Sequence, residues 1–145
     1  MAFSSVMSAV LQGLFVVPVF VEADVSNGLP TFHMVGYLSS EVREASERVR
    51  TAIKNTGILI PAKKIIVNLA PATVKKKGAS FDLPIALSVL GAMSVVPVNK
   101  LEHTLVIGEL TRLSASPSMK SAPKTWAWRR MVLVSSSPVV RNTPG

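Results

Sequence analysis

A strand, a basic loop and a helix are predicted in turn by the stretch Lys63-Lys64-Ile65-Ile66-Val67-Asn68-Leu69-Ala70-Pro71-Ala72-Thr73-Val74-Lys75-Lys76-Lys77-Gly78-Ala79-Ser80-Phe81-Asp82-Leu83-Pro84-Ile85-Ala86-Leu87. β-branched residues dominate 65–70 and Pro71 ends the run, so we expect a strand that is largely buried on both faces. Ser80 is a good N-cap, Asp82 suits the positive end of a helix dipole, and Pro84 falls where a missing N–H is tolerated. A buried helix should therefore begin at Ser80.

The loop between this strand and this helix allows three interpretations: it binds an anion, it holds a nucleophile, or it only turns the chain. Lys75, Lys76 and Lys77 are candidate contacts for the phosphates of DNA. The alternative is a solvated loop, which is the commoner role of a charge run, and no aromatic residue alternates with the lysines for base stacking. Ser80 as a nucleophile needs an activating base, and an N-cap explains it more simply.

The N-terminal part of the chain predicts three strands. Residues 3–11 and 15–25 are apolar and β-branched, with a turn at Gln12-Gly13, and Pro18 indicates an edge or a bulge. Asn27-Gly28 is a strong hairpin signal, so residues 31–35 should return antiparallel beside 15–25.

Two helices and one further strand complete the predicted order. A helix capped by Ser39 or Ser40 should run to about residue 55, with an outward Glu44/Arg48 pair and a stop at Gly57. After the helix at 80–95, residues 104–107 form a last strand. The order β-β-β-α-β-α-β predicts an α/β (α+β) sandwich, a mixed sheet with helices on one face.

Composition narrows the classes of function. The 145 residues suffice for one domain with a core. The absence of cysteine excludes a disulfide framework and thiol catalysis, and fits a cytoplasmic location. His33 and His103 are far apart in the sequence, so we expect neither a metal site nor a catalytic histidine.

The net charge of +8 is unevenly distributed. Residues 1–110 contain ten lysines and arginines against eight acids, whereas residues 111–145 contain six basic residues and no acid. We therefore divide the chain into a domain at 1–112 and an atypical basic, Ser/Pro-rich tail at 113–145, which is either disordered or frameshifted.

Residues 2–21 carry no charge, which raises the alternative of a small membrane or secreted protein. Serines and Pro18 interrupt the run, and no lysine or arginine precedes it, so two strands explain it better. We expect no membrane partner.

Five blocks stand out in this order: Ser26-Asn27-Gly28-Leu29-Pro30-Thr31-Phe32, Val35-Gly36, Glu47-Arg48-Val49-Arg50-Thr51-Ala52-Ile53-Lys54-Asn55, Val67-Asn68-Leu69-Ala70-Pro71-Ala72, and Ser80-Phe81-Asp82-Leu83-Pro84-Ile85-Ala86-Leu87. Together they resemble the N-terminal domain of the ComM/YifB family of magnesium-chelatase-like AAA+ ATPases. The resemblance covers about residues 3–113. It makes Asn27, Gly28, Ser80, Asp82 and Pro84 structural motif residues.

The resemblance implies a fold like domain 2 of ribosomal protein S5 and the proteolytic domain of Lon. It also implies a hexameric parent that acts on DNA, with a family role in branch migration during natural transformation. DNA and further copies of the chain are thus the expected partners. ATP and Mg²⁺ are expected only in the full-length family, because this sequence contains no G-x-x-x-x-G-K-[ST] motif. We expect no catalytic, cofactor-binding or metal-binding residue here.

Departures from the family pattern lead to one hypothesis, and the loop before Ser80 leads to one alternative function. Tyr37-Leu38-Ser39 replaces the usual Leu-Pro-Asp, which is a tolerable drift. The match stops after Gly108-Glu109-Leu110 and the tail that follows contains no acid, so we hypothesise a frameshift near residue 112. Translation of the source DNA in the other two frames tests it. Gly78-Ala79-Ser80 occupies the place of the nucleophile loop of Lon-like domains, which makes a Ser/Lys peptidase the main alternative function, although Lys120 and Lys124 are out of register for the base.

Overall fold

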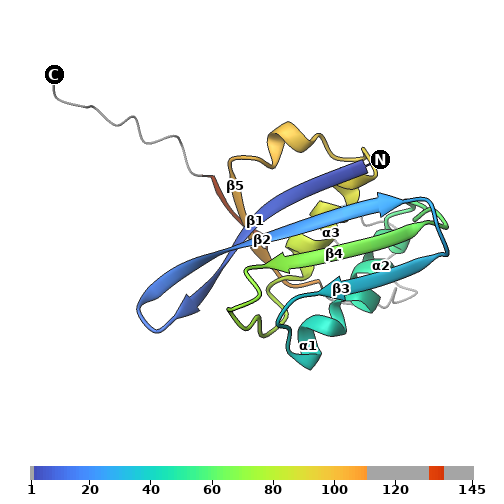
Figure 1. The fold of residues 1–145 in the computed structure, drawn as a ribbon. Helices are drawn as coiled ribbons and strands as arrows, with labels where there is room; N and C mark the ends of the chain where they lie inside the picture. The colour runs from blue at the N-terminus through green and yellow to red at the C-terminus, as the bar shows by residue number, and fades with distance from the viewer. Residues whose placement is uncertain (1, 111–130, 136–145) are drawn as a thin grey trace, which may run out of the picture.

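The computed structural model describes residues 2–110 with their side chains and residues 131–135 as a backbone strand (Figure 1). The rest of the predicted basic tail lies outside the described residues. The strands are β1 (Ala2–Gln12), β2 (Phe15–Ser26), β3 (Thr31–Val35), β4 (Lys64–Ala70), β5 (Thr104–Gly108) and β6 (Met131–Ser135). The helices are α1 (Ser40–Arg43), α2 (Ala45–Asn55), α3 (Asp82–Ala92) and the short 3₁₀ helix η1 (Val98–Lys100).

The strands form one mixed sheet in the order β3-β4-β2-β1-β5-β6. β1 pairs with β2, β2 with β4, and β5 with β6 in antiparallel fashion, whereas β3 and β5 run parallel to β4 and β1. No strand was predicted at the position of β6. The predicted α+β class, with a mixed sheet and helices, is confirmed.

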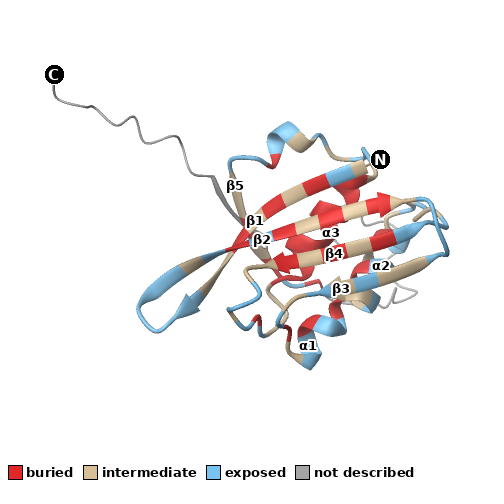
Figure 2. Cartoon of the chain, in the orientation of Figure 1, coloured by how far each residue is buried: buried red, intermediate tan, exposed pale blue. Residues whose placement is uncertain are grey.

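The helices cover one face of the sheet (Figure 1). α3 lies against β1, β2, β4 and β5, and α2 packs on α3 and β3. Every residue of α3 except Leu87 is buried, as its apolar sequence predicts, because the helix contacts the sheet on one side and α2 on another. The core therefore lies between the sheet and these two helices, where Figure 2 shows most of the buried segments.

The predicted β2–β3 hairpin is wrong. β3 pairs in parallel with β4, from Thr31↔Lys64 to Val35↔Asn68, and β4 rather than β3 lies beside β2. β3 does run antiparallel to β2, but β4 lies between them in the sheet. The connection through Asn27 and Gly28 therefore crosses the start of β4. Because β4 can pair on both edges, it separates two segments that are neighbours in the sequence.

The prediction that residues 65–70 are buried on both faces is also wrong. Ile65, Val67 and Leu69 face the helices and are buried, whereas Ile66 and Asn68 on the other face are half-buried. With helices on one side only, the second face of the sheet has no covering layer in the part of the chain that the structure describes.

The predicted helix at 40–55 is divided at Glu44 into α1 and α2. Ser39 caps α1, since its Oγ accepts a hydrogen bond from the Val42 N–H at 3.4 Å. Gly57 follows the C-cap Thr56 with φ +84°, the left-handed conformation that commonly ends a helix. The expected start and stop are both confirmed.

Candidate nucleic-acid interface

The basic loop is held in an extended conformation by the segment that follows β3. The Lys76 N–H donates to the Tyr37 carbonyl at 2.9 Å, and the Ser39 N–H donates to the Lys76 carbonyl at 3.0 Å. Leu38 and Lys76 thereby form a parallel β-bridge. Successive side chains in extended backbone point to opposite sides, so the three lysines cannot all face the same way.

Lys76 points inward and is fully buried. Its Nζ donates to the Pro71 carbonyl. Burial lowers the pKa of the Lys76 ammonium, because the charged form loses its hydration. The alternative of three solvated lysines is therefore wrong for Lys76, and this residue is not accessible to a DNA phosphate.

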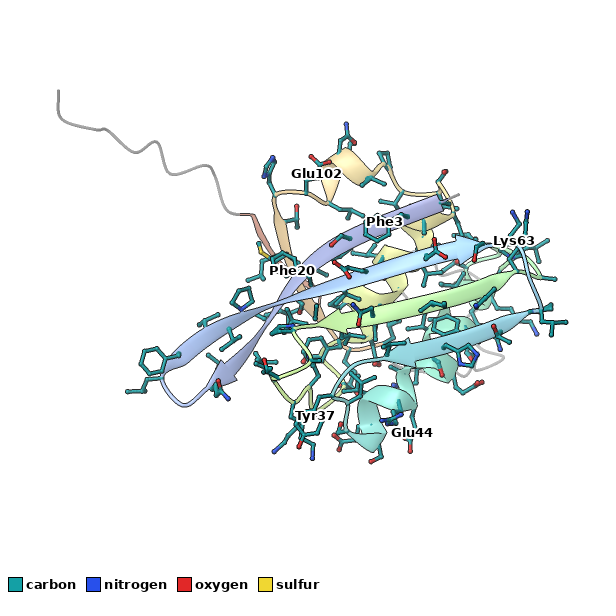
Figure 3. The ribbon with its side chains drawn as sticks, viewed as in Figure 1. Phe3, Phe20, Tyr37, Glu44, Lys63 and Glu102 are labelled. Atoms are coloured by element: carbon teal, nitrogen blue, oxygen red, sulfur yellow. The ribbon has the colours of Figure 1, made fainter. Side chains whose placement is uncertain are left out.

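Lys75 and Lys77 are exposed and line one hollow of about 470 Å³, together with Gln12, Ser80 and Ile107. The Lys75 Nζ also lies 5.5 Å from the centroid of the Tyr37 ring, a cation–π distance. Tyr37 is labelled in Figure 3 and is about half exposed. The hollow thus presents two cations, a hydroxyl and an amide beside apolar side chains that include Leu11, Val74 and Ile107, and its two cations suit an anionic ligand.

The predicted N-cap role of Ser80 is wrong. Phe81 is the N-cap residue of α3, and no side chain caps the helix. Ser80 instead uses its backbone carbonyl, which accepts the Gly108 N–H at 2.9 Å and ties the loop to the end of β5. Within the described residues, neither Lys75 nor Lys77 donates a hydrogen bond to the Ser80 hydroxyl, so neither is a positioned base for this serine.

Asp82 is fully buried and is held by Arg48. The Arg48 Nε donates to Asp82 Oδ2 at 2.7 Å and Nη2 donates to Oδ1 at 2.9 Å, while the Leu110 N–H donates to Oδ2 at 3.3 Å. The hydrogen bond to Asp82 raises the pKa of Arg48 above its ordinary value. The predicted outward Glu44/Arg48 pair is wrong, because Arg48 turns toward α3 to compensate this carboxylate.

A further polar link connects the lysine loop to this ion pair. Glu41 accepts the Gly78 N–H on Oε2 at 3.0 Å, and its backbone carbonyl accepts Arg48 Nη2 at 2.7 Å. The loop that bears Lys77 is thus fixed to α1, and through Arg48 to α2 and α3. Sequence reasoning missed this network, although an aspartate inside a helix that is otherwise apolar already required a cationic partner.

The remaining predicted residues lie elsewhere. Asn27 and Gly28 come just before β3 in the sequence, and the start of β3 lies beside the start of β4. The lysine loop follows the other end of β4, so the two motifs lie at opposite ends of this strand. Pro84 occupies the first turn of α3 and is buried. His33 is exposed on β3, and His103 is exposed just before β5.

The described residues offer no cluster of ligands for a Mg²⁺ ion. Among them, no three His, Asp or Glu side chains gather as ligands, and both oxygens of the buried carboxylate of Asp82 are already engaged by Arg48. In the same residues, no helix has the length and apolar character needed to cross a bilayer.

Residues 21–123 match the family model for subunit ChlI of Mg-chelatase. The chain is 44% identical over 115 residues to YifB of Escherichia coli, and this alignment covers 79% of the chain and 23% of the relative. It is 40% identical over 110 residues to the competence protein ComM of Haemophilus influenzae, covering 76% of the chain and 22% of ComM. A protein of Mycobacterium tuberculosis, Rv2897c, is 38% identical over 111 residues.

The chain thus spans less than a quarter of the length of these relatives. The family match covers most of the chain and extends to residue 123, which is beyond the residues 3–113 that carry the resemblance noted in the sequence. The match begins inside β2, and the strands and helices from β3 to β5 all lie within the matched residues. The chain therefore belongs to the family of subunit ChlI of Mg-chelatase, together with YifB and ComM.

Proposed function

We propose that this region is a non-catalytic N-terminal domain of a magnesium-chelatase-like AAA+ ATPase, and that it contacts DNA through Lys75 and Lys77. The observation that supports this most directly is that the two lysines line a common hollow while the loop that carries them is fixed by Glu41. Hydrolysis of ATP would belong to another part of a longer protein, as it does in the family.

The finer fold assignment is part of the same proposal. A mixed sheet with helices on one face, and a loop that leads from a strand into a buried helix, agree with a fold like domain 2 of ribosomal protein S5. The comparison with a relative named as a competence protein supports a role in DNA processing, which we propose to be branch migration during natural transformation. We also propose a cytoplasmic location, because the sequence contains no cysteine.

The chemistry of the hollow defines the kind of DNA contact. Lysine ammonium groups bind phosphates as point charges, and such contacts give affinity without sequence preference. No base-stacking aromatic lines the hollow among the described residues. We therefore expect weak binding that depends steeply on salt and hardly on base sequence.

Fluorescence anisotropy with labelled single-stranded and double-stranded DNA tests this function. Affinity should fall between about 50 and 200 mM salt, with a log–log slope of about −0.7 to −0.9 for each phosphate contact. Binding that is insensitive to salt, or no binding at the lowest salt, would contradict the DNA role. An ATPase assay on the same sample should give no turnover.

A Ser/Lys peptidase is the second candidate, because Ser80 lines the same hollow as Lys75 and Lys77. A nucleophilic serine needs a base within about 3.2 Å, and the described residues provide none for Ser80. Casein should therefore remain uncut. Hydrolysis that disappears in Ser80→Ala, with unfolding unchanged, would favour the peptidase over the DNA-contacting domain.

A further inference from the structure

The strand pair β1–β2 extends past the rest of the sheet as an apolar arm. β4 pairs with β2 only from Phe20 onward, and β5 pairs with β1 only at Met7. Among the described residues, residues 9–18, which we call the arm, therefore pair only with each other, and Figure 1 shows them projecting from the body. A two-stranded ribbon by itself is marginally stable in water, so a projecting one is expected to be supported by a contact.

The tip of the arm is apolar and exposed. The exposed fractions of Leu11, Leu14, Phe15 and Val16 lie between 63% and 99%, and Figure 2 shows the tip as exposed. No residue from 2 to 21 carries a charge. Four large apolar side chains gathered on one projection form the kind of patch that marks an interaction site.

A hollow of complementary character lies at the opposite end of the same strand pair. Its volume is about 450 Å³, and its lining includes Ala2, Val25, Ile58, Leu59, Met93 and Val95. Lys63 is the one charged residue in this lining. We call this hollow the groove. It is large enough for one or two apolar side chains and has no acidic group that would disfavour them.

The arm cannot reach its own groove. β1 starts at the groove with Ala2 and ends at the arm with Gln12, and eleven residues of strand span about 35 Å. The two surfaces point away from each other along one strand pair. A contact between them requires a second molecule, and such a contact is head-to-tail, because different patches of the two copies meet.

We propose that copies of this chain associate head-to-tail, with the arm of one copy seated in the groove of the next. At about 150 Å² or more for a large side chain, the exposed part of the four tip residues offers roughly 500 Å². The two partners together would bury about 1,000 Å², which is slightly below the range of stable specific interfaces. We therefore expect a weak contact that forms only at high concentration.

Two single substitutions test the contact without disturbing the fold. Leu14 is 99% exposed at the tip and Leu59 is 86% exposed at the groove, so Leu14→Glu and Leu59→Glu remove no core contact. Leu29→Glu is the matched control, because Leu29 is 82% exposed and lies on neither surface. Sedimentation equilibrium of the full chain from about 1 μM to 1 mM is the measurement.

The wild type and Leu29→Glu should form dimers and larger species as concentration rises. Leu14→Glu and Leu59→Glu should each weaken association about tenfold or more, because a charge then meets an apolar surface. An equal mixture of the two variants retains one intact arm and one intact groove. It should therefore form a dimer with wild-type affinity and nothing larger, since the second contact is lost at both ends.

Three results would overturn the proposal. A wild type that stays monomeric to about 1 mM excludes the contact, and would indicate that another part of a longer protein covers the arm. Association of Leu59→Glu at wild-type strength would indicate an arm-to-arm contact. A mixture that remains monomeric would exclude the head-to-tail geometry. None of these results depends on DNA binding, so this proposal can fail while the proposed function stands.

Discussion

The guanidinium group of Arg48 binds both carboxylate oxygens of Asp82, at 2.7 and 2.9 Å, although 34 residues separate them. The pair joins α2 to the first turn of α3 and gives a fully buried carboxylate its counter-charge. A bidentate arginine fixes orientation as well as charge. The beginning of the central helix, and with it the lysine loop, is therefore positioned by a residue of a different helix.

Arg48→Ala should lower the free energy of unfolding by about 3–5 kcal/mol, because it leaves the Asp82 carboxylate buried without a partner. Urea denaturation followed by circular dichroism measures this change. Arg43→Ala is the matched control, since Arg43 is exposed, and should change stability by less than about 0.5 kcal/mol. A loss in Arg48→Ala no larger than that of the control would show that water reaches Asp82.

Lys76 makes stability depend on alkaline pH. Burial lowers its pKa in the folded chain below the ordinary value of 10.5, so in the window between these two values the unfolded chain binds more protons. The free energy of unfolding should therefore rise as the pH increases from the pKa of Lys76 in the folded chain toward 10.5. Below that window Lys76 is charged in both states, and the folded chain is destabilised by the full free energy of burying the ammonium group. Lys76→Met should remove this slope and raise stability at pH 7 by roughly 1 kcal/mol.

Lys77→Met is the control for this effect, because Lys77 is adjacent and exposed. Its unfolding curves should keep the pH dependence of the wild type. If Lys76→Met and Lys77→Met have the same pH profile, Lys76 is hydrated in solution and its inward position is wrong.

Ser4 offers a stabilising substitution. Its hydroxyl is buried on β1 and has no hydrogen-bond partner among the described residues, so Ser4→Ala should raise the free energy of unfolding by about 1 kcal/mol. Ser5→Ala, on the half-buried opposite side of β1, should be neutral within about 0.5 kcal/mol. Thermal unfolding of both variants provides the comparison, and a destabilised Ser4→Ala would reveal a partner for the hydroxyl.

Gly91 of α3 lies directly against Ser4 of β1, so a substitution at Gly91 tests how closely the helix packs on the strand. A Cβ atom added at Gly91 would lie 2.9 Å from the Ser4 Cβ, closer than side chains approach each other. Gly91→Ala should cost about 1–3 kcal/mol, because the helix must move away from β1. Measured stability equal to that of the wild type would mean that α3 can shift at no cost.

Lys75 and Lys77 should carry part of the salt dependence of DNA binding. In Lys75→Ala/Lys77→Ala, the slope of log affinity against log salt should become less steep by about 1.4–1.8, the value for two lost phosphate contacts. Lys54→Ala/Lys100→Ala removes the same charge from two exposed lysines that do not line the hollow. An equal loss of slope in both double variants would assign the effect to net charge instead of to the hollow.

The sequence alone predicted most of the elements. Alternating and continuous apolar runs located β1, β2, β4, β5 and α3 within a few residues. Ser39 and Gly57 marked the start of α1 and the end of α2, since capping depends on a few neighbouring residues. The five blocks around Asn27, Val35, Arg48, Asn68 and Ser80 were also sufficient to indicate the family.

Strand pairing could not be predicted in the same way. Asn27-Gly28 favours a local hairpin, but β3 lies beside β4, which follows it by about 30 residues in the sequence. A turn motif such as Asn27-Gly28 predicts that the chain turns, but it does not predict which strand β3 pairs with, because any strand with a free edge can compete for that pairing. Lys76 is buried while Lys75 and Lys77 are exposed because the backbone of Lys76 forms a β-bridge with Leu38. No sequence pattern near Lys76 indicates this bridge.

Patterns within about fifteen residues were enough to predict the class of fold and the positions of the strands and helices, and five such blocks together indicated the family. The pairing of β3 with β4, the ion pair of Arg48 with Asp82, and the surface that Lys75 and Lys77 share without Lys76 are visible only in the folded chain. These relations join residues that are distant in the chain, or opposite faces of one short segment. They are set by which buried groups must be paired once the sheet and helices have packed.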